Sequence, residues 1–208
     1  MKKIGVLVSG GGTNLQALID AQQSGIIQSG RISLVVSDKP GVYALERAER
    51  AGIKTVVVDK KAYADRAAFD HALAQCLKNA EIDLVVMAGF LSIVGKELIV
   101  QFKNRIINIH PALVPSFCGE GFYGLRVHQA ALDYGVKLTG ATVHFVNEVT
   151  DGGAIIAQKS VPVLADDTAQ SLQRRVMEQA EWVLLPRAVE LFCAERLSID
   201  GRRVIVKE

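Results

Sequence analysis

The sequence lacks the segments that direct a chain into a membrane or out of the cell. No run of about 18 uninterrupted apolar residues occurs, which excludes an ordinary membrane-spanning helix. The apolar stretch that follows the N-terminal lysines ends at Ser9 and is too short for a secretory signal. The three cysteines, Cys76, Cys118 and Cys193, are odd in number and match no metal or disulfide spacing. Free thiols in a reducing compartment are the simplest interpretation, so we expect a cytoplasmic protein.

Strong charge is also missing. The formal net charge is +2, and lysine and arginine form no cluster, so neither a nucleic acid nor a membrane is an expected partner. No His/Asp/Glu spacing resembles a metal site, and we expect no metal. What the sequence does contain is apolar: half of its 208 residues are hydrophobic. That supply suits one large core, so we expect a single domain over 1–208, either monomeric or homodimeric.

Runs rich in Val and Ile alternate with helical patterns in the first half of the chain. Helical spacing of apolar residues marks one helix near Leu15 and another over 69–77. Gly52 follows the stretch 44–51, where a helix should end. The runs read as buried strands over 4–8, 32–36, 54–58 and 84–88. This βαβ alternation predicts a parallel sheet with helices on both faces.

The second half changes character. The sequence predicts a strand over 105–109, a helix over 126–134, strands over 137–146 and 154–163, a long helix over 168–193 and a hairpin over 197–206. Two long strands joined through a Gly-Gly region favour antiparallel pairing. The whole pattern predicts an α/β, Rossmann-like, mostly parallel sheet with helices on both faces and some antiparallel strands in the C-terminal half.

A glycine-rich loop, SGGGTN at 9–14, follows the first strand and opens the first helix. Glycines allow close backbone approach, and a helix N-terminus offers free N–H groups, so the loop suits a phosphate or another anion. The loop lacks the GK[ST] of a P-loop, and Leu15 stands where a dinucleotide fingerprint needs its last glycine. Asp38 could still serve as a ribose-binding acid. A dinucleotide site and a turn that binds nothing therefore remain alternatives.

A second polar group lies near the end of the strand at 105–109. Alternation places Asn108 and His110 on one face, and strand ends in such sheets point into the ligand crevice. An amide donor beside a donor that can carry charge suits a developing oxyanion. Asp151 precedes two glycines; it is either a turn residue or a carboxylate that folds against His110 and keeps it protonated. His144 reads more simply as a packing residue, and His71 and His128 as ordinary helix residues.

Taken together and in order, five segments resemble the phosphoribosylglycinamide formyltransferases. They are VSGGGTNLQ at 8–16, MAGF at 87–90, INIHPAL at 107–113, VHFV at 143–146 and DGG at 151–153. The likeness covers nearly the whole chain. It implies transfer of a formyl group from 10-formyltetrahydrofolate, a co-substrate, to the amine of glycinamide ribonucleotide in purine biosynthesis.

The resemblance also implies roles for individual residues. Asn108, His110 and Asp151 would be catalytic, with His110 as the acid, its pKa raised by Asp151. The ribonucleotide and its phosphate would be held by Gly12, Thr13, Asn14, Leu15, Gln16 and Glu181. The folate would be held by Arg66, Leu91, Ser92, Ile93, Val94 and Asn108.

Three departures from many relatives stand out. Ser92 replaces an arginine, so a charge contact there is absent or comes from elsewhere. Trp182 follows Glu181 where a histidine is common, and the segment upstream is one residue longer. The loop 116–124 differs from a shorter one.

Other functions remain open at this point. Formyltetrahydrofolate hydrolase shares the Asn-x-His-Pro and Asp-Gly-Gly features but carries an N-terminal regulatory domain, whereas this sequence begins at its first strand. Methionyl-tRNA formyltransferase carries a C-terminal RNA-binding domain, whereas only the hairpin comes after the last helix here. A non-catalytic nucleotide-binding module would leave Asn108, His110 and Asp151 without a purpose.

Overall fold

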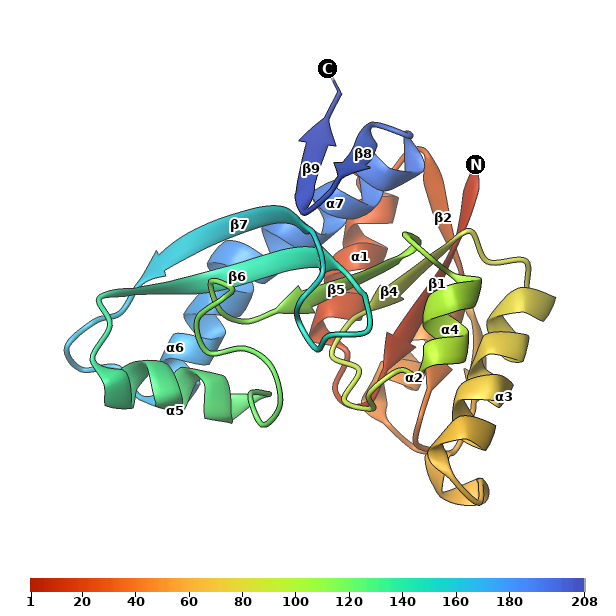
Figure 1. Cartoon of the computed structure of the whole chain (residues 1–208), viewed down its shortest axis with the longest axis horizontal. Coiled ribbons are helices and arrows are strands. Elements are labelled where there is room, and N and C mark those ends of the chain that lie inside the picture. Colours follow the sequence, from red (N-terminus) through yellow and green to blue (C-terminus); the bar gives the residue numbers. More distant parts are fainter. Residues whose placement is uncertain (208) are drawn as a thin grey trace.

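One nine-stranded sheet runs through the chain (Figure 1), and the computed structural model describes residues 1–207. The strands lie in the order β3-β2-β1-β4-β5-β6-β7-β9-β8. Their bounds are Lys2–Val8 (β1), Gly30–Ser37 (β2), Lys54–Val57 (β3), Leu84–Met87 (β4), Ile106–His110 (β5), Leu138–Phe145 (β6), Ile155–Pro162 (β7), Leu197–Asp200 (β8) and Arg203–Val206 (β9).

The first five strands are parallel and are joined by crossovers, while β6 runs antiparallel to β5, and β7 antiparallel to β6. The elements between these strands are α1 (Thr13–Gln23), α2 (Tyr43–Arg50), the short 3-10 turn η1 (Lys60–Ala62), α3 (Arg66–Asn79), α4 (Lys96–Gln101) and α5 (Leu125–Tyr134). The structure confirms the expected α/β fold with a mostly parallel sheet and antiparallel strands in its C-terminal half. The strand at 105–109 begins and ends one residue later than predicted, so His110 lies within β5.

Helices cover both faces of the sheet because successive strand residues point to opposite sides. Val86 packs in the core layer shared with α1, α2 and the C-terminal helices, whereas its neighbour Val85 packs in the layer shared with α3 and α4. Figure 1 shows α3 and α4 beside the strands of the parallel half, away from β6 and β7. The alternation therefore decides which strand side chains enter a core and which remain for a site.

The long helix expected over 168–193 is confirmed, but it contains a π-helical turn that the sequence did not predict. The segment forms α6 (Ala169–Val176), a π-helical turn η2 (Met177–Glu181) and α7 (Trp182–Cys193). Thr168 caps α6 by accepting a hydrogen bond from the backbone N–H of Ser171 at 3.1 Å. Pro186, inside α7, offers no N–H to the preceding turn, which favours departure from α geometry just upstream. A π-helical turn closes its hydrogen bond one residue further along the chain than an α-helical turn does.

The C-terminal hairpin of β8 and β9 is confirmed, and Gly201 takes a positive φ of 60° in its turn. Within residues 1–207, no helix combines the length and the apolar character that crossing a membrane requires.

Candidate active site

The sheet changes direction of winding between β1 and β4, and the glycine loop lies at that switch point. The chain leaves β1 toward β2 on one side and later returns to β4 on the other. The backbone N–H of Ser9 donates to the carbonyl of Gly89 at 3.2 Å, and the Ser9 hydroxyl accepts from the N–H of Leu91 at 2.9 Å. The loops after β1 and β4 are thereby joined at the position where open α/β sheets bind ligands.

A cavity of about 620 Å³ opens beside this junction. Residues from the loops after β1, β4, β5 and β6 and from the C-terminal helices line it. Among them are most of the residues singled out from the sequence: Thr13, Asn14, Arg66, Leu91, Ser92, Ile93, Val94, Asn108, His110, Asp151 and Glu181. The structure thus brings together groups that lie up to 168 positions apart in the chain (Thr13 to Glu181).

Asn108, His110 and Asp151 converge in this cavity, as expected. The Asn108 amide donates to the Asp151 carboxylate at 3.4 Å, and His110 Nδ1 lies 3.4 Å from the other carboxylate oxygen. Asp151 also accepts from the backbone N–H of Gly119 at 2.9 Å. Its own φ of 53° is a strained value for a residue other than glycine. A Cβ on Gly153, two residues later, would collide with the Phe145 carbonyl oxygen, so only glycine fits this fold-back.

His144 is a member of this cluster that sequence reasoning passed over. Its Nδ1–H donates to the Phe145 carbonyl at 2.8 Å, which leaves Nε2 as an acceptor for the Asn108 amide at 3.2 Å. The same Nε2 lies 3.5 Å from Asp151. The cause is strand register, because β6 pairs His144 directly opposite Asn108 on the same face of the sheet. His144 therefore does more than pack in the strand, because its ring also contacts Asn108 in the cavity.

The expected protonation of His110 needs correction. Burial is the largest influence and lowers the pKa of His110, although Asp151 and the Phe117 carbonyl both act to raise it. His110 Nε2–H donates to that carbonyl at 2.8 Å. Asp151 does favour the charged ring, as the sequence suggested, but desolvation outweighs it, so the net shift in the pKa of His110 is downward.

Asp151 itself is held as a carboxylate. Burial alone would raise the pKa of Asp151, but the nearby His144 and His110 rings and the Gly119 N–H together lower it. A fixed negative charge thus stands between the two imidazoles. This arrangement can accept a proton from a nucleophile and stabilise a neighbouring cation.

Helix α2 sets the direction of the glycine loop. The Gly10 carbonyl accepts from the N–H of Ala44 at 3.1 Å, and the Gly11 carbonyl accepts from Arg47 Nε at 2.9 Å. A carbonyl and the N–H of the same peptide point in opposite directions, so the N–H groups of Gly11 and Gly12 point away from α2. Gly12, with φ 71°, starts α1 without a side-chain cap. Free N–H groups and the positive end of a helix dipole can bind an anion.

Glu181 lies at the end of the π-helical turn and lines the cavity. Its carboxylate is buried and accepts from the Asn14 amide at 2.6 Å, a contact between residues of two distant helices. Burial raises the pKa of Glu181 to about 7, and the Asn14 amide acts in the opposite direction. The π-helical turn that holds Glu181 is wider than an α-helical turn.

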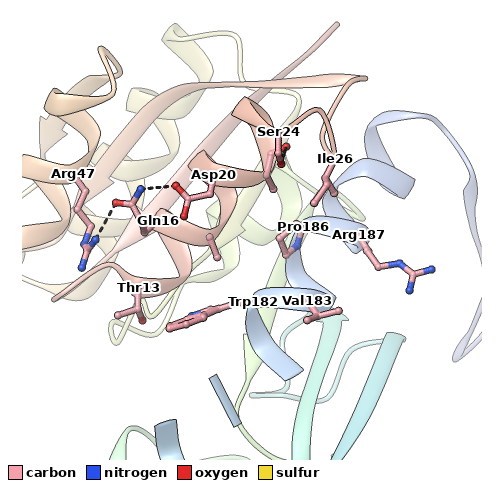
Figure 2. A pocket seen from close by; sticks show the side chains of 12 residues that line it. Thr13, Gln16, Asp20, Ser24, Ile26, Arg47, Trp182, Val183, Pro186 and Arg187 are labelled. Atoms are coloured by element: carbon pink, nitrogen blue, oxygen red, sulfur yellow. Dashed lines mark hydrogen bonds between the residues drawn. The ribbon is translucent and has the colours of Figure 1, made fainter. Parts of the chain in front are cut away.

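Not every expected residue faces the cavity. Leu15 is fully buried in the core, so its side chain offers nothing to a ligand. Gln16 lies on another side of α1, where it bonds Arg47 at 2.9 Å and Asp20 at 2.8 Å (Figure 2). The Ser92 hydroxyl donates to the Asp38 carboxylate at 2.6 Å, and both groups are buried. One oxygen of Asp38 is thus engaged, and the other has no hydrogen-bond partner among residues 1–207.

His128 on α5 is a further cavity residue, although its sequence position suggested only an ordinary helix residue. It lines the cavity and is 1% exposed, and neither ring nitrogen has a hydrogen-bond partner among residues 1–207. Burial, and secondarily the charge of His110, lowers the pKa of His128 to about 4. No local pattern in the sequence marks His128, because only the fold shows that this part of α5 borders the cavity.

Comparison with known proteins agrees with this geometry. Residues 2–189 match the family described as formyl transferase. The chain belongs to the formyl transferase family. The phosphoribosylglycinamide formyltransferase of Haemophilus influenzae is 39% identical over 199 residues, which cover 96% of this chain and 91% of that protein. The crystal structure of glycinamide ribonucleotide transformylase 1 from Symbiobacterium toebii has a TM-score of 0.94 at 46% identity, over 100% of this chain and 95% of that one.

Longer relatives also match. The trifunctional purine biosynthetic protein adenosine-3 of Drosophila melanogaster is 42% identical over 91% of this chain, but the chain spans only 14% of that protein. The corresponding share in the human protein is 20%. The formyltransferase resemblance inferred from the five sequence segments is confirmed, and this chain matches only a small part of each of these longer relatives.

Proposed function

We propose that this protein transfers the formyl group of 10-formyltetrahydrofolate to the amine of glycinamide ribonucleotide. The observation that carries the proposal is the convergence of Asn108, His110 and Asp151 in one cavity, beside an anion site at the start of α1. A ribonucleotide needs such a site for its phosphate. Family membership supports the chemistry.

The cavity wall after β4 suits the folate. Leu91 and Ile93 are more than half exposed although they are large apolar residues, and both line the cavity. A flat apolar ring can cover them. Arg66 donates to the Val94 carbonyl at 3.0 Å, which fixes the same wall and leaves its charge near the cavity for the anionic part of a folate. In this proposal the folate contacts Arg66, Asn108 and residues 91–94.

The reaction needs a donor for a developing oxyanion and an acceptor for a proton. As the substrate amine adds to the formyl carbon, the carbonyl oxygen gains negative charge, and the Asn108 amide and a protonated His110 would stabilise it. The present bonds of the Asn108 amide, at 3.2 and 3.4 Å, are long enough to be exchanged for a substrate oxygen. Asp151 would take the proton from the amine and pass it toward the leaving nitrogen. His144, by accepting from Asn108, would orient that amide.

The ribonucleotide would lie between the glycine loop and Glu181. The N–H groups of Gly12, Thr13 and Asn14 would bind the phosphate, and the Glu181 carboxylate would accept from the amine-bearing arm or from a ribose hydroxyl. Leu15 and Gln16 would contribute only through the backbone position of α1. Inorganic phosphate soaked into crystals should appear at this loop, and density only elsewhere would count against the assignment.

A product assay tests the function directly. The protein is incubated with 10-formyltetrahydrofolate, with and without glycinamide ribonucleotide, and both formate and formylated ribonucleotide are measured. We expect formylated ribonucleotide when the acceptor is present and little formate without it, and His110→Ala serves as the inactive control. Formate released equally well without the acceptor would support the hydrolase instead.

A further inference from the structure

A second cavity lies between α1 and α7, and none of the roles assigned so far uses it. Figure 2 shows this groove, with α1 on one wall and the start of α7 on the other. Its volume is about 530 Å³, within the range of small-molecule sites. Thr13 borders both this groove and the catalytic cavity, so the start of α1 is shared between them.

The walls of the groove are mainly apolar. Small residues on α1, Ala17 and Ala21, leave room opposite Val183 and the ring of Pro186 on α7. The Trp182 indole forms part of the same surface (Figure 2). Val183 is 39% exposed, so a large apolar side chain is left in contact with water inside a concave surface. An apolar ring system would gain free energy by covering it.

Positive charge stands at both ends of this apolar surface. Arg47 and Arg187 lie at opposite ends of the groove in Figure 2. Arg187 is exposed and forms no ion pair with any part of residues 1–207. The one carboxylate in the lining, Asp20, accepts a hydrogen bond from the Gln16 amide at 2.8 Å. The groove therefore has two cationic groups for one anionic group.

From this combination we propose that the groove is a second binding site, for a small ligand with an apolar ring body and an anionic group. The rings would lie against Trp182, Val183 and Pro186. The anionic group would pair with Arg187, the guanidinium that lacks a counter-ion. Apolar lining with a few convergent charged groups is the general composition of such sites.

Arg47 connects this groove to the glycine loop. Its Nε donates to the Gly11 carbonyl at 2.9 Å, its Nη1 donates to Gln16 at 2.9 Å, and its guanidinium lies 4.8 Å from the centre of the Tyr43 ring. These contacts engage Arg47, so Arg187 is the guanidinium left for the anionic group of a ligand.

Tryptophan fluorescence can test this proposal because the chain has a single tryptophan. Trp182 is the only tryptophan in the sequence and lines the groove, so its fluorescence reports ligands bound there. The probe is 8-anilinonaphthalene-1-sulfonate, an apolar ring system with one sulfonate, titrated into the full chain. We expect saturable quenching of Trp182, and affinity at least about tenfold weaker in Arg187→Glu and in Val183→Glu, because each places a negative charge beside the sulfonate.

Arg202→Glu is the matched control, since it makes the same charge change on the exposed turn between β8 and β9. It should leave the probe affinity unchanged within about twofold. If both groove variants bind the probe as tightly as the unmodified protein, or if the control weakens binding equally, the groove is not the site. These outcomes do not depend on formyl transfer and remain informative if the proposed function fails.

Discussion

The buried His128 ring should make a measurable contribution to the pH dependence of the free energy of unfolding. In the folded protein its pKa is lowered to about 4, first by burial and then by the charge of His110. In the unfolded chain the ring returns to an ordinary pKa of about 6.5. A histidine with a lowered pKa stabilises the fold fully above the unfolded value, and that stability is lost as the pH falls toward the folded value.

The magnitude can be worked out from the two pKa values. At about pH 5 the unfolded ring is about 1.5 units below its pKa, and each unit is worth about 1.4 kcal/mol, so protonation stabilises the unfolded chain by about 2 kcal/mol. The folded ring, with a pKa of about 4, gains almost nothing at that pH. Between about pH 8 and about pH 5, the unmodified protein should therefore lose about 2 kcal/mol more stability than His128→Leu.

Urea unfolding followed by circular dichroism at both pH values measures this difference. Other titrating groups, such as Glu181, are present in both proteins and cancel in the comparison. His71→Leu is the control because His71 is an exposed histidine whose Nδ1 lies 2.8 Å from Glu97, and exposed pairs contribute less than about 1 kcal/mol. If His128→Leu shows the same pH dependence as the unmodified protein, the burial argument for His128 is wrong.

Three further changes test the active site. His110→Ala should lower kcat at least about a hundredfold with little change in KM, because the lost donor acts mainly on the developing oxyanion; near-normal turnover in steady-state kinetics would remove the mechanism. Asp151→Asn should slow transfer and lower the pKa in the pH–rate profile, since the carboxylate acts to raise the pKa of His110, and a rise would contradict this. For Glu181 the raised pKa of about 7 means that its stabilising effect, complete below about pH 4.5, is lost as the pH rises to about 7. Relative to Glu181→Gln, the unmodified protein should lose about 3 kcal/mol across that range in urea unfolding, and parallel curves for the two proteins would argue against a buried carboxyl.

Local patterns were enough for the fold and for part of the site. The alternation of Val- and Ile-rich runs with helical spacing predicts the parallel half, because each signal lies within one element. The same alternation places Asn108 and His110 on one face, and β5 confirms it. The glycines beside Asp151 indicate a backbone that can fold back, as it does.

The rest depends on contacts between distant segments. His144 joins the site only through the register of β5 and β6, which no local pattern specifies. The pKa of His110 is lowered because the fold buries the ring. The sequence separation of His110 and Asp151 does not reveal the depth of that burial. The π-helical turn before Trp182 reads as ordinary helix, because the apolar spacing of a long helix hides one wider turn.

The site stands where the parallel half of the sheet meets the antiparallel half, and this gives its parts unequal rigidity. Asn108, His110 and His144 project from two paired strands, so backbone ladders on both sides hold their positions. Asp151 comes from the turn between β6 and β7, and its backbone φ is strained. Hydrogen exchange should accordingly be slow along β5 and β6 and faster at 147–152. The two imidazoles and the amide form the fixed frame, and the carboxylate is the part that can adjust as a proton passes.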